Sequence, residues 1–376
     1  MRSFAYDAVP GRVVFGAGSR RSLPAEVDTL GAHRVLVIAG PDEDRLADEV
    51  AGLLGGRVAG RFRDVVQHVP VAQADQARRM ARDLDADAVL TIGGGSATGF
   101  GKAVALDVDV RQVAVPTTYA GSEMTTIWGL TEGTHKRTGT DPQVKPELVV
   151  YDPELTLTLP PRIAGPSGMN ALAHCVEALY GPGANPVVSL MALEGIRALH
   201  RSLPRVCAEP GDLDARSDAL YGAYLAGVAL ASGGTALHHK TCHVLGGMFG
   251  LDHGGMNAVV LGHALAYNAP ALPGVVGDIA AALGTDDAPG ALYDLAAALG
   301  APTSLAVIGM PADGLDAAAE QVVAAAAGNV RPPERDAIRR MLDDAFHGRR
   351  PGMPRTPGTR GTGDQPGRLA DTRGTR

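Results

Sequence analysis

The chain has 376 residues, of which 45% are hydrophobic and 20% are charged, so it is long enough for two domains and too long for one ordinary core. Its formal net charge is −7, whereas proteins that bind nucleic-acid duplexes usually carry the opposite balance, and we expect no nucleic-acid partner. Three cysteines (Cys175, Cys207 and Cys242) are too few and too scattered for a disulfide framework or a thiolate zinc site. They favour a reducing compartment.

The N-terminal segment MRSFAYDAVPGRVVFG lacks the apolar run of a secretory signal, and we expect a cytoplasmic protein. Residues 219–237 carry no charge over 19 positions, a length that could span a bilayer. This stretch contains four glycines and six alanines and runs into His238 and His239. A helix buried in a large helical domain explains it better, so no membrane partner is expected.

The first half alternates short β-rich runs with helical stretches. Strands are expected at residues 34–39, 65–69, 88–92, 112–115 and 148–151, because these runs are β-branched and bounded by Gly, Pro or Asp. Helices are expected at residues 43–54, 72–84 and 97–106. This alternation predicts an α/β domain over residues 1–155, built on a doubly wound, mostly parallel sheet.

The second half is expected to be an all-helical domain over residues 156–348. Ala- and Leu-rich windows predict helices at residues 168–180, 187–202, 215–230, 236–249, 256–267 and 315–327. Residues 152–162 contain Pro153, Pro160 and Pro161 and are the expected linker. The last 28 residues, 349–376, hold seven Arg, six Gly and four Pro, which predicts a disordered tail; a nucleic-acid tether is the alternative.

A glycine-rich loop follows the strand at 88–92. Gly93, Gly94, Gly95 and Ser96 open the next helix, where a phosphate can approach the backbone and meet the unpaired N–H groups of the helix N-terminus. A tight strand–helix turn is the structural alternative. A second loop, residues 116–123, includes Thr117 and Thr118 and follows the next strand. Open α/β sheets bind ligands at this edge, so both loops are expected to bind a dinucleotide.

Histidines recur at helical spacing in the second half. His174 follows an Asn by four residues, His243 follows His239 by four, and a further His lies in the loop after them: the set is Asn170, His174, His239, His243 and His253. His238 is expected to face away from its neighbours. Imidazoles together with a carboxylate would bind a divalent metal. The position where a carboxylate ligand is expected holds the amide of Asn170 instead, and an amide oxygen is a weaker metal ligand. The case for a metal site is therefore weaker.

Five segments match, in order, the group-III iron-containing alcohol dehydrogenase superfamily: GGGS, PTTYAGSEMT, DPELTLTLP, GMNALAHCVEALY and HHKTCHVLGG with the following DHG. The chain therefore resembles this superfamily over about residues 4–348 and, within it, the maleylacetate reductase family. The resemblance implies a dehydroquinate synthase-like architecture, with an N-terminal dinucleotide-binding domain and a C-terminal helical domain. It also implies a homodimer.

The resemblance also bears on the metal. Metal-dependent members of the superfamily carry an Asp and three His as ligands; the His positions correspond to His174, His239 and His253, and the Asp position is Asn170. Maleylacetate reductases typically show this Asn and are regarded as not needing the metal. Gly99 likewise stands where alcohol dehydrogenases of the superfamily usually have Asp. No metal is therefore expected; if one is present, the three histidines would hold it.

The activity that the resemblance implies is the NADH- or NADPH-dependent reduction of the C=C bond of maleylacetate, a small dicarboxylate, to 3-oxoadipate in aromatic-compound degradation. Hydride addition remote from the ketone moves charge to the ketone oxygen as an enolate, and the neighbouring carbon is then protonated. His243 and His253 are expected to polarise the ketone and to deliver the proton, and which residue has which role stays open. His174, His239 and Asn170 would line the pocket.

Substrate and cofactor selection rest on fewer residues. Lys136 or Arg137 would pair with the substrate carboxylates, unless this segment is a solvated loop. Gly40 ends the first nucleotide strand, where NAD-preferring relatives often have Asp, so both NADH and NADPH are expected to work.

Three other functions stay open at this point. One is a metal-dependent alcohol or aldehyde dehydrogenase, and another is a related reductase recruited to specialised metabolism. A catalytically inactive binding subunit is the third, and the intact GGGS loop and histidine set argue against it.

Overall fold

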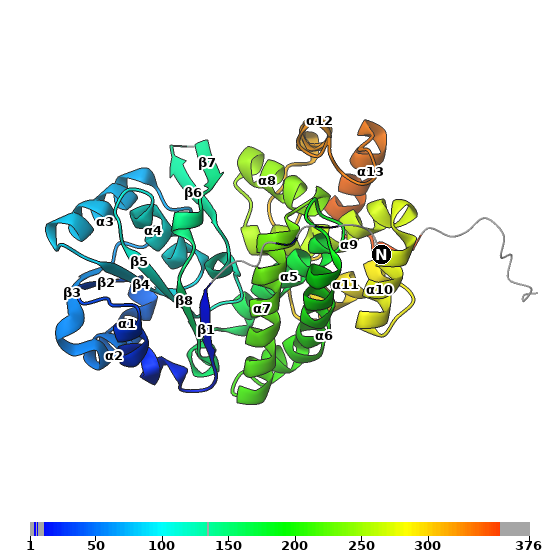
Figure 1. Cartoon of the computed structure of the whole chain (residues 1–376). Helices are drawn as coiled ribbons and strands as arrows, with labels where there is room; N and C mark the ends of the chain where they lie inside the picture. The colour runs from blue at the N-terminus through cyan, green and yellow to red at the C-terminus, as the bar shows by residue number, and fades with distance from the viewer. Residues whose placement is uncertain (1–3, 5, 7–10, 134, 354–376) are drawn as a thin grey trace, which may run out of the picture.

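The computed structural model describes residues 4, 6, 11–133 and 135–353, and it combines an α/β part with a helical part (Figure 1). The α/β part is built on a six-stranded sheet of order β1-β8-β5-β4-β2-β3, in which every neighbouring pair is parallel. The strands are β1 (Arg12–Phe15), β2 (Val35–Ala39), β3 (Val58–Phe62), β4 (Ala88–Gly93), β5 (Arg111–Pro116) and β8 (Leu148–Tyr151).

Both faces of the sheet are covered by helices. These are α1 (Leu23–Thr29), α2 (Asp44–Leu54), α3 (Val71–Asp83) and α4 (Gly95–Ala105). Alternate residues of β2 enter different cores: Val35 and Val37 pack with α1 and α2, whereas Leu36 and Ile38 pack with α3 and α4. The continuous apolar run of β2 is thus explained by burial on two sides, and the doubly wound sheet is confirmed.

One expected strand is wrong. Residues 65–69 form a loop, because His68 and Val69 adopt φ angles of 65° and 49°, which an extended strand does not allow. The neighbouring strand is β3 instead. Gly60 within β3 weakens the strand pattern, but a Cβ there would lie 2.5 Å from Cδ1 of Leu84, so the glycine allows the end of α3 to approach.

An antiparallel hairpin lies outside the main sheet and was not expected. It consists of β6 (Ile127–Glu132) and β7 (His135–Thr140). Its strands are rich in Thr, Gly and charged residues, so they lack a strong strand pattern.

The helical part contains nine helices within the residues that the structure describes. These are α5 (Pro161–Ala178), α6 (Pro186–Ala208), α7 (Leu213–Gly233), α8 (Leu237–Phe249), α9 (His253–Asn268), α10 (Pro273–Leu283), α11 (Ala288–Ala298), α12 (Leu315–Ala325) and α13 (Arg335–Phe346). Side chains of α9 enter two apolar cores, one shared with α5, α6 and α7 and the other with α8, α12 and α13. Helix α9 therefore joins the two halves of this part.

The segment after the sheet corrects two expectations. Helix α5 begins at Pro161, inside the expected linker, because Pro is well tolerated at the first position of a helix. At the other end, residues 349–353 are ordered although a disordered tail was expected from 349. Arg350 pairs with Asp287 and Asp294 at 2.7 Å each, and this anchors the segment. The remainder of the expected tail lies outside the described residues.

The uncharged stretch 219–237 covers the second half of α7 and the start of α8. No single helix among the described residues is both long and apolar enough to cross a membrane. Helices α7 and α8 meet that test only as a pair, and a bend of 94° separates them. Ala226 and Leu237, from the two helices, are fully buried in the protein core.

Candidate active site

The glycine loop lies at the carboxyl end of β4 and at the start of α4. Gly93 ends the strand with φ 139°, and Gly94 precedes the first residue of the helix. A Cβ on Gly93 would lie 2.9 Å from Cβ of Ala97, and one on Gly94 would lie 3.0 Å from Thr118. Close packing within the protein therefore favours glycine at both positions, and the loop lies at the N-terminus of a helix, where a phosphate can bind.

The second expected loop meets the first at the same edge of the sheet. Gly93 pairs with Pro116 across β4 and β5, and the N–H of Thr117 donates to the carbonyl of Gly93 at 3.1 Å. This edge is where parallel α/β sheets bind dinucleotides. Gly40, which follows β2, lies at the same edge.

A carboxylate lies at this edge that the sequence had not indicated. The 3-10 turn Pro41–Glu43 folds the chain back, and the oxygens of Glu43 lie 3.2 and 3.4 Å from the positions that Cβ atoms on Gly40 and Gly93 would take. Burial, followed by the charge of Asp42, raises the pKa of Glu43. Position 40 itself is a glycine without a carboxylate, but the carboxylate of Glu43 lies next to it in the folded chain.

A buried lysine fixes the segment that follows the second loop. Nζ of Lys102 donates to the carbonyls of Ser122, Thr125 and Ile127 at 2.7 to 2.8 Å. Burial lowers the pKa of Lys102 to about 7. Sequence reasoning missed this residue, because a lysine on an α4 face otherwise made of small residues resembles a solvated one.

On the helical side, one face of α5 supplies three polar side chains in successive turns. Asn170, His174 and Glu177 are buried, with relative exposures of 8%, 5% and 0%. The ring of His174 stacks on that of His239 from α8, with centroids 4.9 Å apart. Gly121 of the second loop connects this group with the nucleotide edge, because a Cβ there would lie 3.5 Å from Nδ1 of His174.

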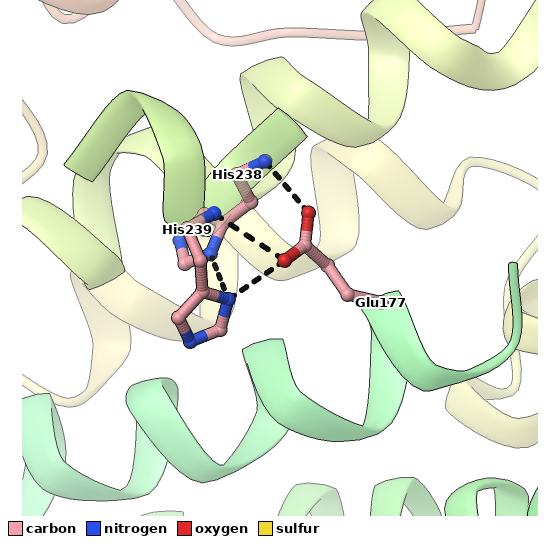
Figure 2. A group of neighbouring side chains, drawn as sticks. All are labelled: Glu177, His238 and His239. Carbon is pink, nitrogen blue, oxygen red and sulfur yellow. Dashed lines mark hydrogen bonds and ion pairs between the residues drawn. The ribbon is translucent and has the colours of Figure 1, made fainter. Parts of the chain in front are cut away.

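Glu177 caps the N-terminus of α8, as Figure 2 shows for His238 and His239. Its carboxylate accepts the backbone N–H groups of Ala236 at 2.9 Å, His238 at 2.7 Å and His239 at 3.3 Å. Its Oε2 also lies 2.7 Å from Nδ1 of His239. Burial raises the pKa of Glu177, but all four neighbours are N–H groups, so we assign an ionised acceptor at the positive end of the helix.

These contacts determine the tautomers of two histidines. Nε2 of His238 lies 3.1 Å from the carbonyl oxygen of Asn257, so this nitrogen carries the proton. Nδ1 of His238 is then an acceptor, and it lies 3.2 Å from Nδ1 of His239. Nδ1 of His239 must carry a proton, which it shares between Glu177 and His238. Nε2 of His239 is left with its lone pair, and it is buried without a partner in the described part of the chain.

The prediction that His238 faces away is wrong. Its side chain is fully buried and bridges Asn257 to His239. A helical wheel places residue 238 off the shared face, but α9 packs against that side of α8 and makes it interior. Glu177 was missed as well, although its position three residues after His174 on the same helix is a usable signal.

The remaining two histidines lie at the edge of this cluster. His243 is exposed, and its ring centroid is 6.4 Å from that of His239. His253 is the exposed first residue of α9. Burial lowers the pKa of His239 to about 3, and His243 and His253 contribute further by their charge. The structure thus brings the expected histidines together, with the buried ones neutral.

The expected substrate cations lie in the antiparallel hairpin. Lys136 and Arg137 are on β7, where Arg137 is exposed and pairs in register with Leu130. The side chain of Lys136 is outside the described part of the structure. Lys240, which sequence reasoning missed, is exposed on α8 and close enough to lower the pKa of His239.

The donor atoms also indicate what the cluster could hold. Among the described residues, Glu177, His238 and His239 have ligand atoms within 4.8 Å of one another, but the N–H groups above already satisfy them. Oδ1 of Asn170 and Nε2 of His239, in contrast, are buried and unpartnered within the described chain. Together with His174 and His253 they form an amide-and-imidazole set that fits a divalent cation, more weakly than a set with a carboxylate.

Two family models match the chain. The one described as iron-containing alcohol dehydrogenase matches residues 10–153, and the one described as Fe-containing alcohol dehydrogenase family, C-terminal, matches residues 165–346.

Individual relatives are similar over nearly their whole length. The chain is 49% identical over 351 residues to maleylacetate reductase of Burkholderia cepacia, covering 93% of this chain and 100% of the relative. It is 51% identical over 354 residues to maleylacetate reductase 2 of Cupriavidus pinatubonensis, covering 93% and 99%. The crystal structure of maleylacetate reductase from Agrobacterium tumefaciens matches with a TM-score of 0.91 and 46% identity, covering 93% and 100%.

Proposed function

The chain belongs to the iron-containing alcohol dehydrogenase family, and from that premise we propose that it reduces the C=C bond of maleylacetate to 3-oxoadipate with NADH or NADPH. It is an oxidoreductase, as its relatives are. The proposal is supported by the uncharged side chains of Asn170, His174 and His239, which gather close to Gly121 of the second loop. The chain is also about half identical to enzymes named for this reaction.

The reaction asks for a hydride donor, a stabiliser of the enolate and a proton donor. Bound NAD(P)H supplies the hydride. The substrate carbon remote from the ketone takes it, the π electrons move to the ketone oxygen, and the carbon next to the ketone then takes a proton. The glycine loop would position the pyrophosphate at the N-terminus of α4, and Gly121 lies close to His174, since a Cβ on it would be 3.5 Å from Nδ1 of His174; the nucleotide and the histidines would then share one site.

The histidines divide into two roles. His239 is neutral, and its free Nε2 carries a lone pair, so it can accept a hydrogen bond but cannot donate one to an enolate. Donation at the ketone oxygen and protonation of carbon therefore fall to His243 and His253, which are exposed at the edge of the cluster. Lys240, Lys136 and Arg137 are the candidates that would attract the substrate carboxylates.

Turnover is proposed not to require a metal. An enolate is far less basic than the alkoxide formed when an aldehyde is reduced, so hydrogen-bond donors suffice for it. If a divalent cation binds, His174, His239 and His253 with Oδ1 of Asn170 would hold it, and it would supply Lewis-acid polarisation of the ketone oxygen.

Four further properties belong to the proposal. The architecture is dehydroquinate synthase-like, and the enzyme works in the cytoplasm on products of aromatic-compound degradation. NADH is favoured over NADPH, because Glu43 would repel a 2′-phosphate at the end of β2. The chain forms a homodimer, which the exposed edge strand β1 supports: its Phe15 is 39% exposed beside Tyr221 at 37%.

Steady-state oxidation of NADH tests the function. The purified chain is assayed with maleylacetate and with simple aldehydes, each with and without EDTA. Turnover of maleylacetate that survives EDTA, with little turnover of aldehydes, is the expected result. Turnover of aldehydes that needs stoichiometric zinc or iron would instead assign a metal-dependent alcohol dehydrogenase. If the folded chain binds NADH but shows neither activity, the result would support the alternative of a related reductase recruited to specialised metabolism.

A further inference from the structure

A cavity lies in the helical part, away from the histidine cluster. It has a volume of about 470 Å³ and lies between α9, α13 and residues 349–352. His263 lines it from α9, ten residues after His253, which corresponds to about 15 Å along the helix axis. A volume of this size accommodates a small organic molecule.

One wall of the cavity is built by the chain after α13. Arg350 pairs with Asp287 and Asp294, and the hydroxyl of Tyr293 donates to the carbonyl of Gly348 at 2.7 Å. Pro351 packs close to α9, 3.1 Å from the position of a Cβ on Gly262. These contacts fix the wall without a ligand.

Four arginines and one aspartate line the cavity: Arg331, Arg340, Arg349 and Arg350 with Asp344. Arg349 and Arg350 have carboxylate partners. Arg331 instead donates to the carbonyl of Tyr267 at 2.6 Å and lies 4.3 Å from the centroid of its ring. Neither Arg331 nor Arg340 has an ion-pair partner among the described residues, so two positive charges at the cavity are not neutralised.

A buried polar atom without a partner lies at the same cavity. His263 is 3% exposed, and its Nε2 makes no hydrogen bond within the described chain. Burial lowers the pKa of His263 to about 4, so the ring is neutral near pH 7. Nε2 has almost no accessible surface, so the neutral ring forms an uncharged part of the cavity wall.

We propose that this cavity binds a small organic carboxylate. Arg331 and Arg340 bind the carboxylate group, and Ala337 and Met341 contact the apolar body of the ligand.

Calorimetric titration of the full chain tests this site, with sodium benzoate in one series and sodium sulfate in another, both in the presence of saturating NADH. Benzoate is expected to bind saturably at one site per chain and more tightly than sulfate. Arg340→Gln is expected to weaken benzoate binding by about tenfold or more, because it removes a charged hydrogen bond from an exposed position. Arg79→Gln, an exposed arginine on α3, is the matched control and leaves binding unchanged.

Three results would overturn the proposal. The first is the absence of saturable benzoate binding, and the second is equal weakening in the Arg340 and Arg79 variants. The third is sulfate binding as tight as benzoate binding, which would show that the apolar wall contributes nothing. Thermal unfolding of both variants confirms that they are folded.

Discussion

Oε2 of Glu177 lies 2.7 Å from Nδ1 of His239, and this contact decides which ring nitrogen of His239 is left for the substrate. The same carboxylate accepts three backbone N–H groups at the start of α8, so the helix and the imidazole are held by one side chain. A residue outside the expected ligand set thus controls the chemistry of a residue within it.

The variant Glu177→Gln tests whether Glu177 fixes the tautomer of His239. An amide has one acceptor oxygen, and its NH₂ group would oppose an N–H of α8, so the tautomer of His239 is no longer fixed. We expect kcat to fall by about 10- to 100-fold, with little change in the KM for NADH. Steady-state kinetics measure both quantities. Glu194→Gln, which changes a partly exposed glutamate on α6, is the control, and an unchanged kcat in Glu177→Gln would contradict the assignment.

The fold class was predicted well, because the strand pattern of the first half and the helical pattern of the second half are both strong. The buried strands of the sheet are continuous β-branched runs, and the second half is helical by composition. The strand at 65–69 failed because left-handed φ values at His68 and Val69 are set by a turn that the β-branched pattern does not reveal.

The site was predicted less completely. Spacing identified His174 and His239, but the packing of α9 on α8 makes His238 interior, and spacing along one helix cannot show that. Glu43 was missed because a 3-10 turn, rather than the strand itself, brings its carboxylate to Gly40. A contact between two helices decides the first case, and a local turn decides the second.

The glycine loop gives a second prediction. In Gly94→Val the Cβ would lie 3.0 Å from Thr118 and its methyl groups would fill the space of the pyrophosphate. NADH affinity is expected to fall by more than about tenfold, or roughly 1.4 kcal/mol. Calorimetric binding of NADH measures this. Gly52→Ala, at an open helical position, is the control; wild-type affinity in Gly94→Val would place the cofactor elsewhere.

Glu43 gives a third prediction, on cofactor selection. Glu43→Gln removes a negative charge beside Gly40 and Gly93, so the KM for NADPH is expected to fall by about tenfold relative to that for NADH. Asp42→Asn removes the neighbouring exposed charge and serves as the control. If both variants shift the NADPH preference equally, general charge and not the position of Glu43 is responsible.

The buried histidines give a fourth prediction, on stability. Burial lowers the pKa of His238 and of His239 to about 3, and that of His263 to about 4. These rings stay neutral in the folded state, whereas the unfolded chain binds protons below about pH 6.5. Stability is therefore full above that pH and falls as the pH decreases towards 4, by up to about 1.4 kcal/mol per pH unit for each ring.

Thermal unfolding across this range checks the sign. The melting temperature is expected to be lower at about pH 5 than at pH 7.5. A melting temperature that is constant or higher at the lower pH would show that these histidines are not held neutral.

The position of the transferred hydride tests the central claim most directly. Single-turnover reduction of maleylacetate with NADH deuterated at C4 of the nicotinamide, followed by NMR of the product, locates the deuterium. The account predicts 3-oxoadipate with deuterium on the methylene carbon remote from the ketone, because the hydride adds to the conjugated C=C bond. Deuterium on a carbinol carbon, formed by reduction of the ketone itself, would contradict it.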